Sequence, residues 1–151
     1  MKKKEWANAV WLLFHTLAEK LKPEFQSEVE TLFSHFNNIC YNLPCPDCQS
    51  HAVAAMQSAN KKVICLSQEN LKRFVWEFHN NVNKRINNPI YPYSQLDKYK
   101  TANTRNVILN FVNIMSRTVN SEKVMMNNFQ RKLYMTKFKE YISANIFKFY
   151  P

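Results

Sequence analysis

The chain has 151 residues, enough for one domain with a hydrophobic core or for a compact domain with an extension. It contains no glycine, which excludes the glycine-rich loops that bind nucleotide phosphates, so any nucleotide must be held by side chains on helices. The net charge of +10 suits a solvated basic surface or an acidic partner, but no nucleic-acid recognition motif is present, and a nucleic-acid partner is not expected.

The first twenty residues resemble a secretion signal, because lysines are followed by apolar residues. Glu5, Asn8 and His15 interrupt the apolar run, and no small-residue cleavage site follows it cleanly. No apolar run approaches the ~20 residues needed to span a bilayer, so no membrane span is expected. We therefore expect a cytoplasmic chain with reduced thiols, in which a CxxC motif is catalytic or metal-binding rather than structural.

Apolar residues at three- and four-residue steps predict helices in chain order. The first helix has the stripe Trp6, Val10, Leu13, Leu17 and Leu21. Pro23 suits the first turn of the second helix. Its stripe is Phe25, Val29, Leu32, Phe33, Phe36 and Ile39. Pro44 ends that segment, a third helix is expected from Cys48 to about Met56, and residues 57–67 are expected to be a connection.

Ser67 is the predicted N-cap of a fourth helix. Its apolar face is Leu71, Val75, Phe78, Val82 and Ile86. The sequence NNPIYP at 87–92 ends this helix, and Ser94 is expected to cap a fifth helix that contains Leu96 and Tyr99.

Beyond residue 100 the chain carries eight Lys and Arg against two Asp and Glu, and it has no cysteine, histidine or tryptophan. Two more helices are expected on apolar stripes at Ile108, Phe111, Val112 and Met115, and at Phe129, Leu133 and Phe138. No strand-like alternation is present. We therefore predict an all-α fold, with a four- or five-helix bundle over residues 1–100 and a basic helical extension over 101–151 that serves packing or dimerisation.

The chemistry depends on the CxxC motif formed by Cys45 and Cys48, near the N-terminus of the third predicted helix. One hypothesis is a redox pair, since a helix N-terminus stabilises a thiolate and lowers the pKa of a thiol. A second is a zinc site, because His51 has compatible spacing and Cys40 or Cys65 could supply a fourth ligand. The third is that both residues only pack.

Two helix faces combine aromatic and polar residues. Trp11 and His15 are neighbours on the first helix. On the fourth helix one face carries Trp76, His79, Asn80 and Asn83. Each residue alone is more typical of ordinary packing or a solvated surface. Together they offer flat rings and amides for a purine or ribose, and Lys84 and Arg85 follow at once and could bind phosphates.

The ordered motifs W-x3-H, P-C-x2-C and H-N-x-V-N resemble those of the Erv/ALR family of FAD-linked sulfhydryl oxidases, over about residues 5–100. The segments CQSHA (residues 48–52) and FHNNVN (residues 78–83) are most similar to those of compact members encoded by large DNA viruses. The resemblance implies a helical bundle that binds FAD non-covalently, commonly as a homodimer. It implies a thiol oxidase that forms disulfides and passes electrons through the CxxC pair and flavin to dioxygen, giving hydrogen peroxide.

The resemblance also implies roles for individual residues. Cys45 would exchange with incoming thiols, and Cys48 would lie against the isoalloxazine ring. The implied cofactor-binding residues are Trp11, His15, His51, Trp76, His79, Asn80, Val82, Asn83 and Lys84. No metal is expected. The partners would be thiol-containing protein substrates or a thiol–disulfide relay protein, in the host cytoplasm or virion if the chain is viral. The alternative is a zinc-stabilised helical interaction module.

Some positions depart from the family pattern. Members often have a disulfide whose two cysteines flank H-N-x-V-N, where this chain has Trp76 and Tyr93. Many also carry a shuttle cysteine pair in a flexible tail, and residues 101–151 contain no cysteine. Cys40 and Cys65 are isolated in the sequence, and we expect them to be buried or idle rather than a shuttle pair.

Overall fold

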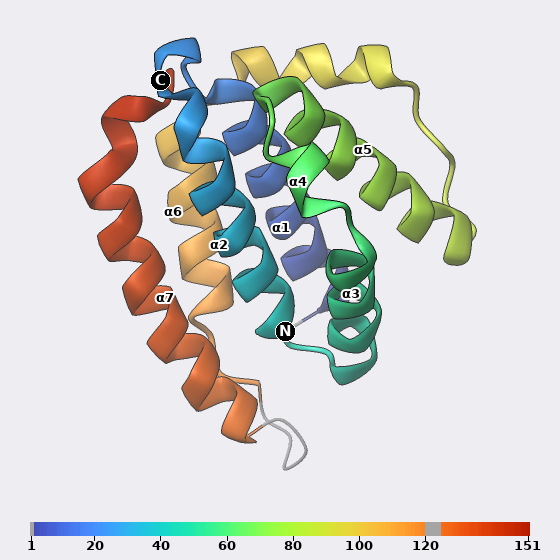
Figure 1. Cartoon of the computed structure of the whole chain (residues 1–151). Coiled ribbons are helices and arrows are strands. Elements are labelled where there is room, and N and C mark those ends of the chain that lie inside the picture. Colours follow the sequence, from blue (N-terminus) through green and yellow to red (C-terminus); the bar gives the residue numbers. More distant parts are fainter. Residues whose placement is uncertain (1, 120–124) are drawn as a thin grey trace.

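The computed structural model describes residues 2–119 and 125–151, and these are helical apart from their connections and one isolated bridge between Leu21 and Phe149. The α-helices are α1 (Lys3–Lys20), α2 (Val29–Tyr41), α3 (Pro46–Ser58), α4 (Lys61–Ile64), α5 (Gln68–Arg85), α6 (Thr104–Met115) and α7 (Met125–Asn145). Short 3-10 helices are η1 (Pro23–Glu28), η2 (Tyr93–Thr101) and η4 (Ile146–Lys148). The all-α prediction is confirmed (Figure 1).

Helix α1 is the central element, because it packs against α5, α6 and η2. Its predicted stripe from Trp6 to Leu21 is buried throughout, with Leu13 and Leu17 fully inaccessible. Further α1 residues off that stripe are also buried, among them His15 and Thr16. A helix enclosed on several sides can therefore present polar side chains to the interior, where they need hydrogen-bond partners.

Several local predictions differ from the structure. Pro23 begins the 3-10 helix η1, and α2 starts only at Val29, so Phe25 is half-buried rather than in the core. The predicted connection 57–67 contains the short helix α4. Ser67 is the N-cap of α5 as predicted, since its Oγ accepts a hydrogen bond from the backbone N–H of Asn70 at 3.0 Å.

The predicted fifth helix is a 3-10 helix, and Ser94 does not cap it. The residue at the N-cap position of η2 is Pro92, and no side chain caps it there. Ser94 lies inside η2, and the first turn is closed by a hydrogen bond from the backbone N–H of Gln95 to the carbonyl of Pro92 at 3.1 Å. Leu96 and Tyr99 are buried, as expected from the apolar spacing.

The predicted apolar stripe of the last helix is wrong. Phe129 and Leu133 are 65% and 53% exposed, and only Phe138 of that stripe is buried. The buried face of α7 runs instead through Arg131, Met135, Phe138 and Ile142. These steps of four, three and four residues keep one helix face, whereas the step of five from Leu133 to Phe138 leaves it. The last residue of the α5 stripe, Ile86, is likewise 47% exposed.

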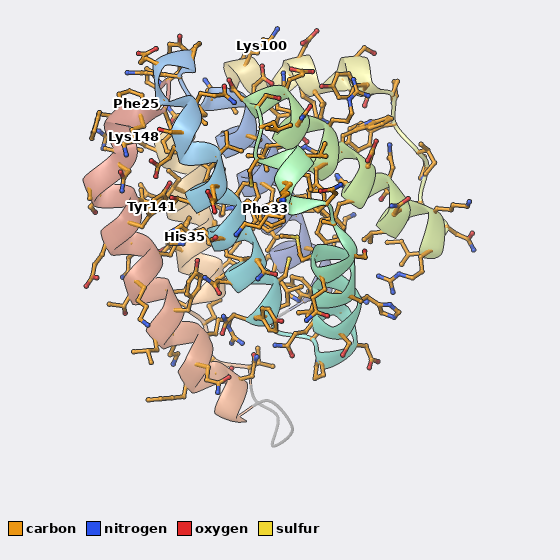
Figure 2. The ribbon with its side chains drawn as sticks, viewed as in Figure 1. Phe25, Phe33, His35, Lys100, Tyr141 and Lys148 are labelled. Carbon is orange, nitrogen blue, oxygen red and sulfur yellow. The ribbon has the colours of Figure 1, made fainter. Side chains whose placement is uncertain are left out.

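The segment after residue 100 packs on the helices before it. Phe111 of α6 and Phe138 of α7 are fully buried and belong to the same hydrophobic core as α1 and α2. Figure 2 shows His35 of α2 beside Tyr141 of α7, and their ring centroids are 4.0 Å apart. The division of the chain at residue 100 stays a prediction. Among the described helices, none is both long and apolar enough to cross a bilayer.

Candidate active site

The CxxC motif lies at the N-terminus of α3, as expected, although this helix begins at Pro46 rather than at Cys48. Cys45 is the N-cap residue, and its Sγ accepts a hydrogen bond from the backbone N–H of Cys48 at 3.3 Å. Pro46 occupies the first helical turn, where its missing N–H costs nothing and its φ suits the helix. Both thiols are free and half-buried. The local sequence therefore holds the two cysteines together at the start of a helix, with Cys45 receiving the helix N–H.

Cys48 also lies on the wall of an apolar cavity of about 110 Å³ between α1, α2, α3 and α5. Four aromatic rings contribute to its lining: Trp6, Trp11, Phe14 and Phe78. Cys45 is not among the lining residues. The two sulfurs therefore have different surroundings: Cys48 faces an aromatic cavity, and Cys45 lies outside it.

Two cations and a third sulfur also line this cavity. The cations are Lys3, at the start of α1, and Arg85, at the end of α5. Cys40 of α2 is fully buried in the wall, and burial raises the pKa of its thiol to about 12. A thiol with such a pKa stays neutral at physiological pH and is a poor nucleophile.

The pKa of Cys48 is raised, contrary to the lowering expected at a helix N-terminus. Burial is the largest cause, and the hydrogen bond with Cys45 acts in the same direction. Lys3 opposes both causes and lowers the pKa. The expectation failed because burial of the Cys48 thiol outweighs its position in the first turn of the helix.

Beside the cavity, the predicted aromatic residues of two helices meet. The indole of Trp11 and the imidazole of His79 are stacked, with ring centroids 4.1 Å apart and planes at 8°. Phe78, which lines the cavity, packs edge-on against the same indole at 5.0 Å. Trp11 is thus shared between the cavity and the stack, so the sulfur site and the aromatic stack are contiguous.

A polar cluster lies on the other side of the stack. Nε2 of His15 is 2.9 Å from Nδ1 of His79, and the hydroxyl of Tyr91 lies 2.7 Å and 3.0 Å from these two nitrogens. Burial, together with His79 and Lys98, lowers the pKa of His15 to about 3. Burial and Lys98 lower the pKa of His79 to about 4. Both imidazoles are therefore neutral at physiological pH.

The amides of α5 hold the segment that carries Tyr91. Asn80, which is buried, donates its side-chain N–H to the carbonyl of Tyr91 at 3.1 Å and accepts from the Tyr91 N–H at 3.3 Å. Trp76 donates its indole N–H to the same carbonyl at 3.1 Å, and Asn83 donates to Asn80 at 3.4 Å. Asn80 and Trp76 thus fix the backbone after α5, and Asn83 supports Asn80.

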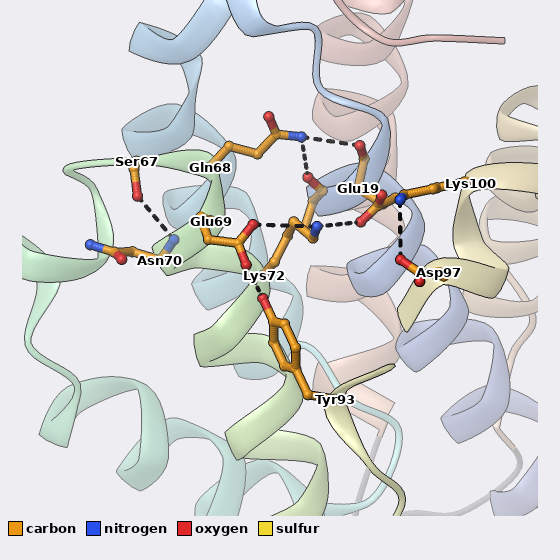
Figure 3. A network of polar contacts seen from close by, with 10 residues as sticks. Glu19, Ser67, Gln68, Glu69, Asn70, Lys72, Tyr93, Asp97 and Lys100 are labelled. Carbon is orange, nitrogen blue, oxygen red and sulfur yellow. Dashed lines mark hydrogen bonds and ion pairs between the residues drawn. The ribbon is translucent and has the colours of Figure 1, made fainter. Parts of the chain in front are cut away.

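The segment from Tyr91 to η2 also contacts α1 and α5 through a network of charged groups. Lys72 lies 2.8 Å from Glu19 and 3.4 Å from Glu69, and the Tyr93 hydroxyl donates to Glu69 (Figure 3). Trp76 and Tyr93, which stand where family members often have a disulfide, are in edge-to-face contact with ring centroids 5.3 Å apart. Noncovalent contacts therefore join the same two positions.

The remaining proposed site residues are not all in this region. Val82 lines the cavity. His51 and Lys84 are exposed and lie outside its lining, and their roles stay predictions. Within the described residues, no group of three or more His, Cys, Asp or Glu side chains could hold a metal ion, so the zinc hypothesis finds no support there.

Sequence reasoning missed Tyr91, Tyr99 and Lys3. Tyr91 lies in a segment recognised only as a helix terminator, and Tyr99, whose ring stacks on His15 at 4.7 Å, was placed only as a helix residue. Lys3 is one of three consecutive lysines, and nothing local distinguishes it from its neighbours. A local pattern could not have found these residues, because their partners are distant in the sequence.

The described part of the chain is helical and places a CxxC pair beside an aromatic cavity. The comparison with known proteins is more specific. The model of the Erv1 / Alr family matches residues 8–105, and the chain belongs to this family.

Three viral relatives are similar to this chain, and each has a name that assigns it provisionally as an FAD-linked sulfhydryl oxidase. Protein 096R of Invertebrate iridescent virus 3 is 32% identical over 87 residues, which cover 57% of this chain and 59% of the relative. Protein FPV093 of Fowlpox virus (strain NVSL) is 34% identical over 55 residues, 36% of this chain and 54% of the relative. Protein 347L of Invertebrate iridescent virus 6 is 28% identical over 96 residues, 59% and 86% of the two chains.

The match with the first two of these relatives spans between half and three fifths of their length. No solved structure matches the chain significantly.

Proposed function

We propose that this protein is an FAD-dependent sulfhydryl oxidase that converts pairs of thiols in protein substrates into disulfides and delivers the electrons to dioxygen. The observation that carries the proposal is the asymmetry of the CxxC pair. Cys48 faces an aromatic cavity that a flat ring could enter, and Cys45 lies outside it at the N-cap of α3. Membership of the Erv1 / Alr family and the names of the viral relatives support the same activity.

The residues present fit a flavin nucleotide. The cavity offers aromatic walls for an apolar ring system, and Lys3 and Arg85 supply positive charge beside it for an anionic group. The stacked Trp11 and His79 offer aromatic surface for a second ring. Helix side chains thus provide each kind of contact, as a chain without glycine requires.

The stacking of Trp11 on His79 restricts where an adenine ring can bind. At a centroid separation of 4.1 Å, Trp11 and His79 leave no space for a third ring between them. A ring stacked between them would need roughly double that separation. Adenine would therefore lie on an outer face of the pair, or His79 would move away from Trp11 on binding.

The thiol chemistry follows from the surroundings of the two sulfurs. A substrate thiolate attacks Sγ of Cys45 in the Cys45–Cys48 disulfide, and Cys48 leaves with the electron pair. A second substrate thiolate then attacks the substrate sulfur of the mixed disulfide, and Cys45 is released and protonated. The substrate has lost two electrons and the CxxC pair has gained them. FAD bound beside Cys48 would supply the acceptor for this electron pair and the route to dioxygen, whose reduction with two protons gives hydrogen peroxide.

The spectrum of the purified protein and its oxygen chemistry test the proposal. We expect a yellow protein that releases hydrogen peroxide and consumes oxygen when a small dithiol is added. The matched pair of variants is Cys48→Ser and Cys65→Ser, since Cys65 lies outside the cavity. A colourless protein that contains about one zinc ion per chain would contradict the oxidase and support the zinc-stabilised interaction module, since a structural site binds one ion.

We also propose a homodimer, a thiol-containing protein or relay protein as partner, and a location in the host cytoplasm or virion. The exposed apolar residues Ile86, which caps α5 and also lines the cavity, and Ile90 support an additional contact surface. Light scattering of the purified chain measures the mass. A monomer at micromolar concentration would contradict the homodimer without affecting the proposed chemistry.

A further inference from the structure

Lys3 is placed so that it can act on the sulfur of Cys48. It begins α1, whereas Cys48 lies in the first turn of α3, and both side chains line the same cavity. The cavity wall around them is otherwise mostly aromatic and aliphatic. A charge at the edge of such a wall is less screened than a charge surrounded by water.

The other charged and titratable groups near Cys48 are few. Arg85 lines the cavity from α5, and Cys40 lines it from α2 with a neutral thiol. Cys45 and the exposed Asp47 belong to the same helix start as Cys48. Within the described residues, no carboxylate lines the cavity, so the charged side chains on its wall are positive.

We propose that Lys3 is a positioning residue for thiol–disulfide exchange, whose ammonium group stabilises the thiolate that leaves from Cys48. This role deepens the proposed oxidase function and rests on it. In the exchange step, the bond between substrate sulfur and Cys45 forms, the Cys45–Cys48 bond breaks, and the electron pair goes to Cys48. Exchange is faster when the leaving thiol has a lower pKa.

The environment of Cys48 explains why such a residue is needed. The backbone N–H of Cys48 donates to Cys45, and the position of Cys48 at the helix N-terminus does not offset its burial. Burial and Cys45 raise the pKa of Cys48, and Lys3 acts against both. Without a positive charge here, the leaving group would be a half-buried thiolate beside aromatic rings, which is unfavourable.

The test measures the thiolate of Cys48 directly in the full-length chain. Cys45→Ser leaves Cys48 as a free thiol, and its alkylation by iodoacetamide is followed by mass spectrometry of the peptide that contains Cys48, over a range of pH. In this background Lys3→Met is compared with Lys4→Met, which removes the same charge one residue further along. Lys4 does not line the cavity.

We expect Lys3→Met to slow the alkylation of Cys48 at neutral pH by about 3- to 5-fold and to move its pH profile upward, because Lys3 is exposed and an exposed charge has a modest effect. Lys3→Arg should restore the rate, and high salt should reduce the difference. Equal rates and profiles for Lys3→Met and Lys4→Met would overturn the proposal, as would an effect that arginine does not rescue. The alkylation needs neither flavin nor oxygen, so this result is separate from success or failure of the oxidase assay.

Discussion

The hydroxyl of Tyr91 lies 2.7 Å from Nε2 of His15, although 76 residues separate them in the sequence. The same hydroxyl is 3.0 Å from Nδ1 of His79, and the imidazole of His79 is stacked on Trp11. One phenol therefore joins α1, α5 and the segment after α5 beside the cavity that Cys48 lines. The aromatic site is held by a residue that belongs to none of the family's motifs.

Removing the Tyr91 hydroxyl should destabilise this cluster. Tyr91→Phe keeps the ring but leaves the buried His15 and the half-buried His79 with one fewer partner, so we expect the free energy of unfolding to fall by about 1–3 kcal/mol. Urea denaturation followed by circular dichroism measures the change. The control is Tyr93→Phe, because the Tyr93 hydroxyl contacts Glu69 at an exposed position. Equal stability of the two variants would contradict a structural role for the Tyr91 hydroxyl.

The buried histidine should make stability depend on pH. The pKa of His15 is lowered to about 3 in the folded protein, from about 6.5 in the unfolded chain, so between these values the unfolded chain binds more protons. The contribution of neutral His15 is therefore fully present above about pH 6.5 and is lost as the pH falls toward 3, by up to about 1.4 kcal/mol per pH unit. His15→Gln should flatten the pH dependence of the unfolding free energy over this range. Parallel curves for wild type and variant would show that His15 does not titrate as its burial implies.

The two cysteines of the CxxC motif should both be essential for the proposed activity. Cys45→Ser and Cys48→Ser should each reduce peroxide release with a small dithiol to the uncatalysed rate, because disulfide exchange needs both sulfurs. Cys65→Ser is the matched control and should retain turnover, since Cys65 lies outside the cavity. Peroxide release by either CxxC variant at the wild-type rate would rule out the assigned exchange pair.

The stacked pair should contribute to binding of FAD. His79→Ala and Trp11→Ala should each weaken FAD binding by about 2- to 10-fold, since an aromatic stacking contact contributes ~0.5–1.5 kcal/mol. Loss of cofactor should also lower the melting temperature. Fluorescence titration with FAD measures the affinity, with the exposed aromatic variant Phe129→Ala as control. If both site variants bind FAD like the control, the adenosine part lies elsewhere.

The C-terminal helix should be part of the hydrophobic core rather than an independent arm. Phe138 is fully buried, and Phe129 on the same helix is 65% exposed. Phe138→Ala should therefore cost about 3–5 kcal/mol of unfolding free energy, and Phe129→Ala less than about 0.5 kcal/mol. Thermal or urea unfolding of both variants measures the difference. A small effect of Phe138→Ala would mean that α7 can separate from the core without loss of stability.

The sequence by itself determined that the fold is helical and that the CxxC motif lies near the start of a helix. Both depend on neighbours within one or two turns: the apolar period that buries Leu13 and Leu17, the cap at Ser67, and Pro44 just before the CxxC motif. The ordered motifs also identified the family, because their residue types and spacings can be read directly from the sequence.

Only the tertiary structure decided which residues complete the site. The contact of Tyr91 with His15 and the shared cavity of Lys3 and Cys48 join segments that lie far apart in the chain. No period or cap predicts such pairs, because they depend on how the helices pack against α1. The pKa of Cys48 is raised rather than lowered for the same reason. Its helix position favours a thiolate, but burial among side chains from other helices disfavours it.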